Sequence, residues 1–203
     1  MSLHREITGV ILAGGKSRRI GKDKAFLTVD GETFLTRITR TMRSVFEQIY
    51  IISNDGSYRF FSLPVFKDLY QGCGPLAGIH AGLLHSRTQA SFVVPCDTPF
   101  ISEELIEYII SFGGHADVVV PMTEEKLHPL CGLYSRRCLS VIEESLRNRR
   151  VKVRDVLTRL YTVVIPITPR LSLYRSDLLL NVNELKDYDL ATHSGEHPSP
   201  GSP

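Results

Sequence analysis

Residues 7–24 read ITGVILAGGKSRRIGKDK, and this stretch decides the fold. Its apolar beginning, Ile7–Ala13, predicts a buried β-strand. Two adjacent glycines, Gly14 and Gly15, follow at once, and five basic residues lie in the nine positions after them. Open α/β sheets bind ligands just beyond the carboxyl ends of their strands, which is where this loop would lie. The stretch therefore predicts a ligand-binding loop after the first strand of an α/β fold.

Similar apolar runs recur along the chain, with helical patterns between several of them. The helix predicted from Thr33 to Phe46 carries its apolar side chains on one face. Ser102, followed by two acidic residues, predicts the N-cap of another helix. This alternation predicts a three-layer α/β/α arrangement with a mostly parallel, Rossmann-like central sheet. Further strands are predicted at Gln48–Ser53, Ser91–Pro95, Asp117–Pro121 and Tyr161–Ile167.

The length of 203 residues predicts a single domain over residues 1–191. The last twelve residues, Thr192–Pro203, are polar and rich in Pro, Gly and Ser, and they predict a disordered tail. No apolar run approaches the roughly 20 residues of a membrane span, and the polar N-terminus does not resemble a secretory leader. We therefore expect a cytoplasmic protein with no membrane partner.

Charge and cysteine content exclude several functional classes. The 24 basic and 22 acidic residues give a net charge of +2, too near balance to predict a nucleic-acid partner, although a small anionic ligand remains compatible. No two cysteines form a C-x-x-C pair, so their spacing predicts neither a zinc site nor a disulfide framework. The four are Cys73, Cys96, Cys131 and Cys138.

The glycine loop itself has the composition of an anion cradle. Adjacent glycines let backbone N–H groups approach phosphate oxygens, and Arg19 and Lys24 can neutralise phosphate charge. A P-loop is excluded because its first glycine would fall at Val10, and a Rossmann fingerprint is excluded because no G-x-G-x-x-G follows the strand. The alternative is an ordinary turn whose basic residues face solvent.

A second candidate, Asp97, lies two residues past the end of the strand Ser91–Pro95 and so faces the same sheet edge as the glycine loop. Mg²⁺ takes one or two protein carboxylates together with phosphate and water oxygens. Asp97 is therefore the predicted metal ligand, and its alternative role is that of a turn residue at a helix N-terminus.

These motifs together resemble a known family. Leu12–Lys24 fits L-A-G-G-x-S-x-R-[MI]-G-x-D-K, which is similar to the motif of GT-A-like nucleotidyltransferases and especially of molybdenum cofactor guanylyltransferases (MobA family). Pro95-Cys96-Asp97-Thr98-Pro99 and the G-P-L-x-G segment at Gly74–Gly78 resemble further motifs of that family. The resemblance extends from Leu12 to Asn183.

The resemblance implies transfer of GMP from GTP to the terminal phosphate of molybdopterin, with release of pyrophosphate and with Mg²⁺, or Mn²⁺ in its place, as cofactor. It implies that Arg19, Lys24 and Asp97 are catalytic and that Asp97 holds the metal. It also implies that Asn54 and Asp68 recognise base and ribose, although either could be a turn residue. The implied nucleotide-binding set is Leu12, Ala13, Gly14, Gly15, Ser17, Lys24, Asn54, Asp68, Gly74, Pro75, Leu76 and Asp97.

The resemblance implies an acceptor side at His128, Asn181 and Asn183, and the basic run around Arg150 could hold the phosphate of an anionic acceptor. A lone histidine is more often structural, and a basic run at a helix C-terminus is as often a solvated end. The N-V-N segment lacks the Thr-Pro that follows it in the family and continues with Glu184-Leu185 instead.

Two other functions remain open. A cytidylyl- or sugar-phosphate nucleotidyltransferase would keep the glycine loop and Asp97 but change the base and acceptor contacts. A nucleotide- or pterin-binding chaperone for molybdoenzymes would bind without chemistry. The resemblance implies GTP and a molybdopterin as ligands and other cofactor-biosynthesis proteins or molybdoenzymes as partners.

Overall fold

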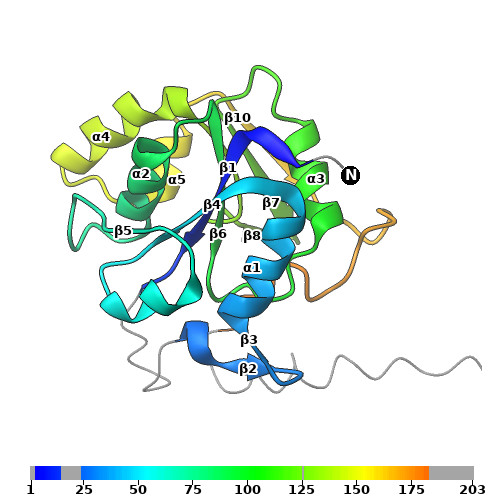
Figure 1. Cartoon of the computed structure of the whole chain (residues 1–203). Coiled ribbons are helices and arrows are strands. Elements are labelled where there is room, and N and C mark those ends of the chain that lie inside the picture. Colours follow the sequence, from blue (N-terminus) through cyan, green and yellow to red (C-terminus); the bar gives the residue numbers. More distant parts are fainter. Residues whose placement is uncertain (1–2, 15–23, 125, 183–203) are drawn as a thin grey trace, which may run out of the picture.

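The computed structural model describes residues 3–14, 24–124 and 126–182, without the side chains of residues 59 and 60 (Figure 1). Its centre is an eight-stranded sheet in the order β10-β7-β9-β6-β1-β4-β5, with β8 paired to β7. The strands are β1 (His4–Leu12), β4 (Phe46–Ile52), β5 (Val65–Phe66), β6 (Ala90–Pro95), β7 (Val118–Thr123), β8 (Lys126–Leu127), β9 (Gly132–Ser135) and β10 (Thr162–Pro166).

Most of this sheet is parallel, as predicted. The strand β1 pairs in parallel with both β4 and β6, and β10 pairs in parallel with β7. The strand β9 is antiparallel to both of its neighbours, β6 and β7, so those two run in the same direction. The carboxyl ends of β1, β4, β6, β7 and β10 therefore meet at one edge of the sheet.

Helices cover both faces of the sheet, which confirms the predicted three layers (Figure 1). On one face α1 (Phe34–Val45) and α3 (Glu103–Ser111) pack into one apolar cluster with β1 and β4. On the other face α2 (Pro75–His85), α4 (Leu139–Arg147) and α5 (Val153–Leu157) share a second cluster.

Local sequence explains where two of these helices begin. The Oγ1 of Thr33 accepts a hydrogen bond from the N–H of Thr36 at the start of α1, and Ser102 does the same for Leu105 in α3. Both side chains satisfy N–H groups that have no partner within the helix. The predicted N-cap at Ser102 is confirmed.

The sequence did not predict where the antiparallel strand β9 is inserted. Its first residue, Gly132, lies so close to β7 that an added Cβ would sit 2.4 Å from the carbonyl oxygen of Val119.

A short hairpin of β2 (Thr28–Val29) and β3 (Glu32–Thr33) and the single-turn helix η1 (Lys24–Phe26) were also not predicted. They connect the glycine loop to α1.

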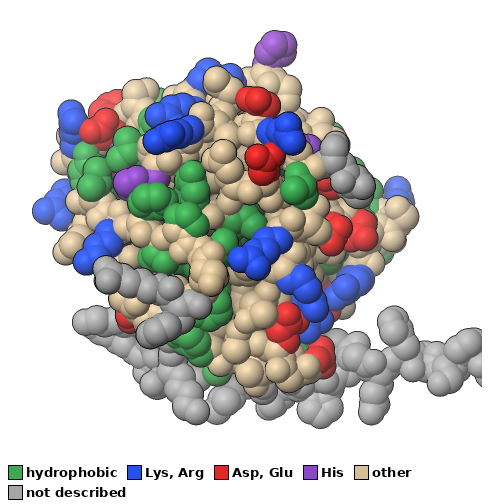
Figure 2. All heavy atoms as spheres, in the orientation of Figure 1, with side chains coloured by type: hydrophobic (Ala, Val, Ile, Leu, Met, Phe, Trp, Pro, Cys, Tyr) green, Lys and Arg blue, Asp and Glu red, His purple; other side chains and the backbone are tan. Residues whose placement is uncertain are grey.

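Acidic and basic side chains are interspersed on the face seen in Figure 2, and no single basic stripe crosses it. Within the described ranges, none of the helices has the length and apolar character needed to cross a membrane.

Candidate functional site

The loops that follow β1, β4 and β6 are held side by side at the carboxyl edge of the sheet. The N–H of Ala13 donates to the carbonyl of Ile52 at 2.9 Å, and the N–H of Cys96 donates to the carbonyl of Leu12 at 3.0 Å. Gly14, Ser53 and Asp97 consequently begin three adjacent loops. The convergence predicted from strand order is present.

Lys24 and Asp97 form an ion pair at this edge, with Nζ and Oδ2 3.2 Å apart and both side chains about four-fifths buried. The second carboxylate oxygen of Asp97, Oδ1, is buried and has no hydrogen-bond partner among the described residues. A buried oxygen of this kind is costly unless something binds it. Its chemistry is that of a ligand for a hard cation.

The donor set fits Mg²⁺ or Mn²⁺ shared with a phosphate group. Mg²⁺ is usually held by one or two carboxylates, with phosphate and water oxygens completing its octahedron. The described part of the chain contains no group of three or more His, Cys, Asp or Glu side chains able to form an all-protein site. Asp97 would thus supply a protein ligand to the metal, and phosphate oxygens of the substrate would supply most of the remaining ligands.

Gly14 has a conformation that requires glycine, since its φ is +133°. An added Cβ would also lie 3.3 Å from the Oγ of Ser53. One detail of the predicted anion cradle needs correction: the N–H of Ala13 is already bonded to Ile52 and cannot also donate to a phosphate. Because the N–H of Ala13 extends the pairing of β1 with β4, the backbone donors of the predicted cradle would begin at Gly14.

Asn54 and Asp68, which lie 14 residues apart, are hydrogen-bonded to each other. The Nδ2 of Asn54 donates to Oδ2 of Asp68 at 2.9 Å, and the N–H of Asp68 donates to Oδ1 of Asn54 at 3.3 Å. The other oxygen of Asp68, Oδ1, is buried and has no partner among the described residues. The pair joins the loops after β4 and β5 and presents one unsatisfied acceptor.

The segment Gly74–Leu76 opens α2 at the same edge. Gly74 has φ +66° and open space where a Cβ would be, and it provides no side-chain cap for the helix. Pro75 begins the helix, where its missing N–H has no cost. Leu76, predicted to bind nucleotide, is 1% exposed and packs in the core, so its side chain is not available to a ligand.

The C-terminal segment reaches the loop that carries Asp97. The Oγ1 of Thr98 donates to Oδ1 of Asn181 at 2.9 Å, and the N–H of Val182 donates to the carbonyl of Asp97 at 2.9 Å. Asn181, predicted on the acceptor side, is thus brought to the loop that carries Asp97. The roles of Thr98 and Val182 were not predicted, although Thr98 stands inside the Pro95–Pro99 motif.

His128 lies at the same sheet edge but in a structural setting. His128 is 7% exposed, and its Nε2 is 2.6 Å from the Oγ1 of Thr123, the last residue of β7. Burial, with a smaller contribution from Lys126, lowers the pKa of His128 from 6.5 to about 4. The described contacts support the structural alternative over the acceptor role.

We expect His128 to make stability pH-dependent. Because its folded pKa lies below its unfolded value, its contribution is complete above about pH 6.5 and is lost as pH falls toward 4. Wild-type protein should lose about 2 kcal/mol more unfolding free energy than His128→Gln between pH 7.5 and 5. Urea unfolding of both proteins at each pH measures this difference, and parallel losses would contradict it.

Arg150, the other acceptor candidate, is exposed in the connection between α4 and α5. Its neighbour Arg147 pairs with Glu143 at 2.7 Å, whereas Arg150 has no carboxylate partner in the described residues. No described contact brings Arg150 to Asp97.

Several predicted site residues lie outside the described residues, as does the segment Thr192–Pro203. They are Gly15, Ser17, Arg19 and Asn183.

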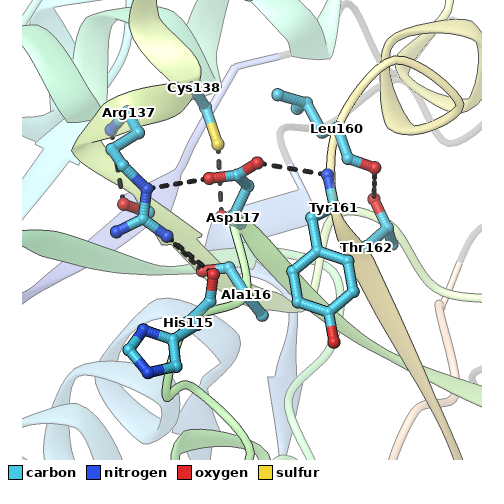
Figure 3. Close-up of polar contacts among 9 residues, drawn as sticks. His115, Ala116, Asp117, Arg137, Cys138, Leu160, Tyr161 and Thr162 are labelled. Carbon is cyan, nitrogen blue, oxygen red and sulfur yellow. Dashed lines mark hydrogen bonds and ion pairs between the residues drawn. The ribbon is translucent and has the colours of Figure 1, made fainter.

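A second polar cluster lies at the opposite edge of the sheet (Figure 3). Asp117, just before β7, accepts hydrogen bonds from the Nε of Arg137 at 2.9 Å and from the N–H of Tyr161 at 3.1 Å. Cys138 donates to the carbonyl of Asp117, and burial raises the pKa of its thiol to about 12. A thiol that stays protonated is a poor nucleophile, and the hydrogen bonds of this cluster join β7, β9 and β10.

Comparison with known proteins gives consistent matches. Residues 9–163 match the family model described as MobA-like NTP transferase domain. The chain is 43% identical over 159 residues to the molybdenum cofactor guanylyltransferase of Desulfosudis oleivorans, which spans 76% of this chain and 78% of that protein.

Two crystal structures share the fold. Molybdopterin-guanine dinucleotide biosynthesis protein A from Archaeoglobus fulgidus superposes with a TM-score of 0.79 at 23% identity, over 92% of this chain and 97% of that one. The 4-diphosphocytidyl-2C-methyl-D-erythritol synthase of Anaerococcus prevotii superposes with a TM-score of 0.75 at 12% identity, over 94% and 96%. At these identities the likeness establishes the fold alone.

Proposed function

Because this chain belongs to the MobA-like NTP transferase family, we propose that it transfers GMP from GTP to the terminal phosphate of molybdopterin and releases pyrophosphate. The observation that carries the proposal is the pair of Lys24 and Asp97 beside Gly14, with one carboxylate oxygen still unsatisfied. An ammonium group, a metal-binding carboxylate and a glycine loop at one sheet edge are what a triphosphate requires.

In this mechanism the chain acts mainly by positioning. A phosphate oxygen of the acceptor attacks the α-phosphorus of GTP, the bond to the bridging oxygen breaks, and pyrophosphate leaves with the electron pair. The attacking phosphate is already ionised, so no general base is needed. Holding the two phosphates in line converts a bimolecular encounter into an oriented reaction.

Lys24 and Asp97 have distinct tasks in this step. The ammonium of Lys24 would bind phosphate oxygens on which negative charge accumulates as the bond breaks. Asp97 would hold Mg²⁺, which when bound offsets phosphate charge and supplies Lewis acidity. Arg19 is proposed to act on the same phosphates.

Asn54 and Asp68 are proposed to bind the nucleoside. Their mutual hydrogen bonds fix both side chains, and the buried Oδ1 of Asp68 is an acceptor suited to a ribose hydroxyl or a base N–H group. Gly74, which has no heavy atom within 4 Å of the place of a Cβ, is proposed to allow close approach of the nucleotide.

Base selectivity tests the proposal directly. GTP with Mg²⁺ should raise the melting temperature more than CTP, ATP or UTP does at equal concentration, because a ligand of the native state stabilises it by RT ln(1 + [L]/Kd). A tenfold difference in dissociation constant corresponds to about 1.4 kcal/mol at saturating nucleotide. Differential scanning fluorimetry gives the four shifts in one experiment.

Equal shifts for GTP and CTP would contradict guanine selectivity. A larger shift for CTP would instead favour a cytidylyltransferase, which the fold alone allows, as the Anaerococcus prevotii structure illustrates. Binding of GTP without release of pyrophosphate in the presence of molybdopterin would favour a nucleotide-binding chaperone.

A further inference from the structure

The segment from Leu178 to Val182 contacts the loop of Asp97 through two hydrogen bonds. One anchors the backbone, since the carbonyl of Asp97 accepts from the N–H of Val182 at 2.9 Å. The other joins side chains, since the Oγ1 of Thr98 donates to Asn181 at 2.9 Å. Thr98 is 1% exposed, so its hydroxyl is shielded from competing water.

The same segment also packs against the chain that carries Lys24. Val182 is fully buried in a small apolar cluster, separate from the two main clusters, made with Val29, Phe34, Phe100, Leu27 and Leu180. Leu27 follows η1, and its N–H donates to the carbonyl of Lys24 at 3.0 Å.

This small cluster therefore contains residues from both of the segments that carry the ion pair of Lys24 and Asp97. Phe100 belongs to the loop that begins with Asp97, and Leu27 belongs to the segment that begins with Lys24. Val182 contributes to the cluster and bonds to Asp97 directly.

We propose that residues 178–182 form a clasp that positions the carboxylate of Asp97 relative to Lys24, with Thr98 and Val182 as its positioning residues. The inference rests on the proposed function. Both bonds act on the carboxyl side of the Asp97 Cα, whereas on its amino side the N–H of Cys96 is bonded to the carbonyl of Leu12. The clasp thus limits where the metal-binding oxygen can lie without touching metal or substrate itself.

The test replaces Thr98 in the full-length chain. Thr98→Val keeps the branched shape and removes the hydroxyl, and we expect it to raise the dissociation constant for Mn²⁺ in the presence of GTP about tenfold, as changes behind a metal ligand commonly do. Electron paramagnetic resonance of free Mn²⁺ measures this constant without any turnover. Thr98→Ser keeps the donor and should restore the affinity.

Thr8→Val is the matched control. Thr8 is also a buried threonine, and its hydroxyl bonds to Thr88 and Ser86 at 2.8 Å each. It belongs to β1 but lies away from the carboxyl end. We expect a lower melting temperature with unchanged Mn²⁺ affinity, which separates loss of stability from loss of positioning.

The outcomes distinguish the clasp from the proposed function. Wild-type Mn²⁺ affinity in Thr98→Val, alongside weakened binding in Asp97→Asn, would overturn the clasp alone. Unchanged Mn²⁺ affinity in Asp97→Asn would overturn the metal role of Asp97 and the clasp with it. If Thr98→Val does not fold, Val182→Ala tests the clasp from its apolar side and should weaken Mn²⁺ binding in the same direction.

Discussion

Asp97→Asn is expected to lower the rate of pyrophosphate release by about 10³-fold, the upper range for losing one electrostatic group that acts on a transition state. The substitution changes little volume but replaces a charged oxygen with an amide. The buried Oδ1, which has no partner among the described residues, would no longer be part of an anionic carboxylate able to hold Mg²⁺. A continuous pyrophosphate assay with GTP and molybdopterin measures the effect.

The fold should survive this substitution. Both side chains of the ion pair with Lys24 are about four-fifths buried, so its loss is expected to cost about 3 kcal/mol, which is less than the roughly 5–15 kcal/mol that stabilises a typical domain. Circular dichroism and the melting temperature serve as controls. Activity close to wild type in a folded Asp97→Asn protein would refute the catalytic role of Asp97.

Gly132→Ala is expected to destabilise the protein by about 3 kcal/mol, the upper end of the usual range, because overpacking against a rigid neighbour cannot relax without moving backbone. The new Cβ would lie 2.4 Å from the carbonyl oxygen of Val119 and 2.9 Å from Cγ1 of Val120. The strands β7 and β9 would have to separate, which opens the core between them. Urea unfolding gives the change in free energy.

Gly56→Ala is the matched control for this prediction. No heavy atom lies within 4 Å of the position that its Cβ would take, and its φ is not positive. We expect a change within about 0.5 kcal/mol. If both alanine variants were equally stable, the tight packing of β9 on β7 would not matter for stability.

The sequence predicted the strand positions well because buried strands leave a strong local pattern. Ile7–Ala13 and Ser91–Pro95 correspond to β1 and β6, with boundaries shifted by a few residues. The caps of α1 and α3 were equally local, since one hydroxyl and the N–H three residues later define them. The insertion of β9 left no local pattern, because which strand becomes its neighbour depends on the whole sheet.

The residues of the candidate site likewise fall into those that local sequence could identify and those that it could not. Gly14 and Asp97 were identifiable because each lies just past the end of a buried strand, and parallel strands bring such positions to one edge. The burial of Leu76 and His128 was not identifiable, because the same residue types could equally face a ligand. Only the packing of neighbouring elements decides which alternative holds.

By itself, the sequence determined the class of fold, and it predicted the sheet edge of the candidate site with Gly14 and Asp97 at that edge. The tertiary structure alone decided that Lys24 pairs with Asp97, that Asn54 pairs with Asp68, and that Thr98 and Val182 join the C-terminal segment to the site. The physical reason is the separation along the sequence over which each kind of interaction acts. Strand periodicity and helix capping act over a few residues, whereas these contacts join residues 14 to 85 positions apart, and only the folded chain brings them within hydrogen-bond distance.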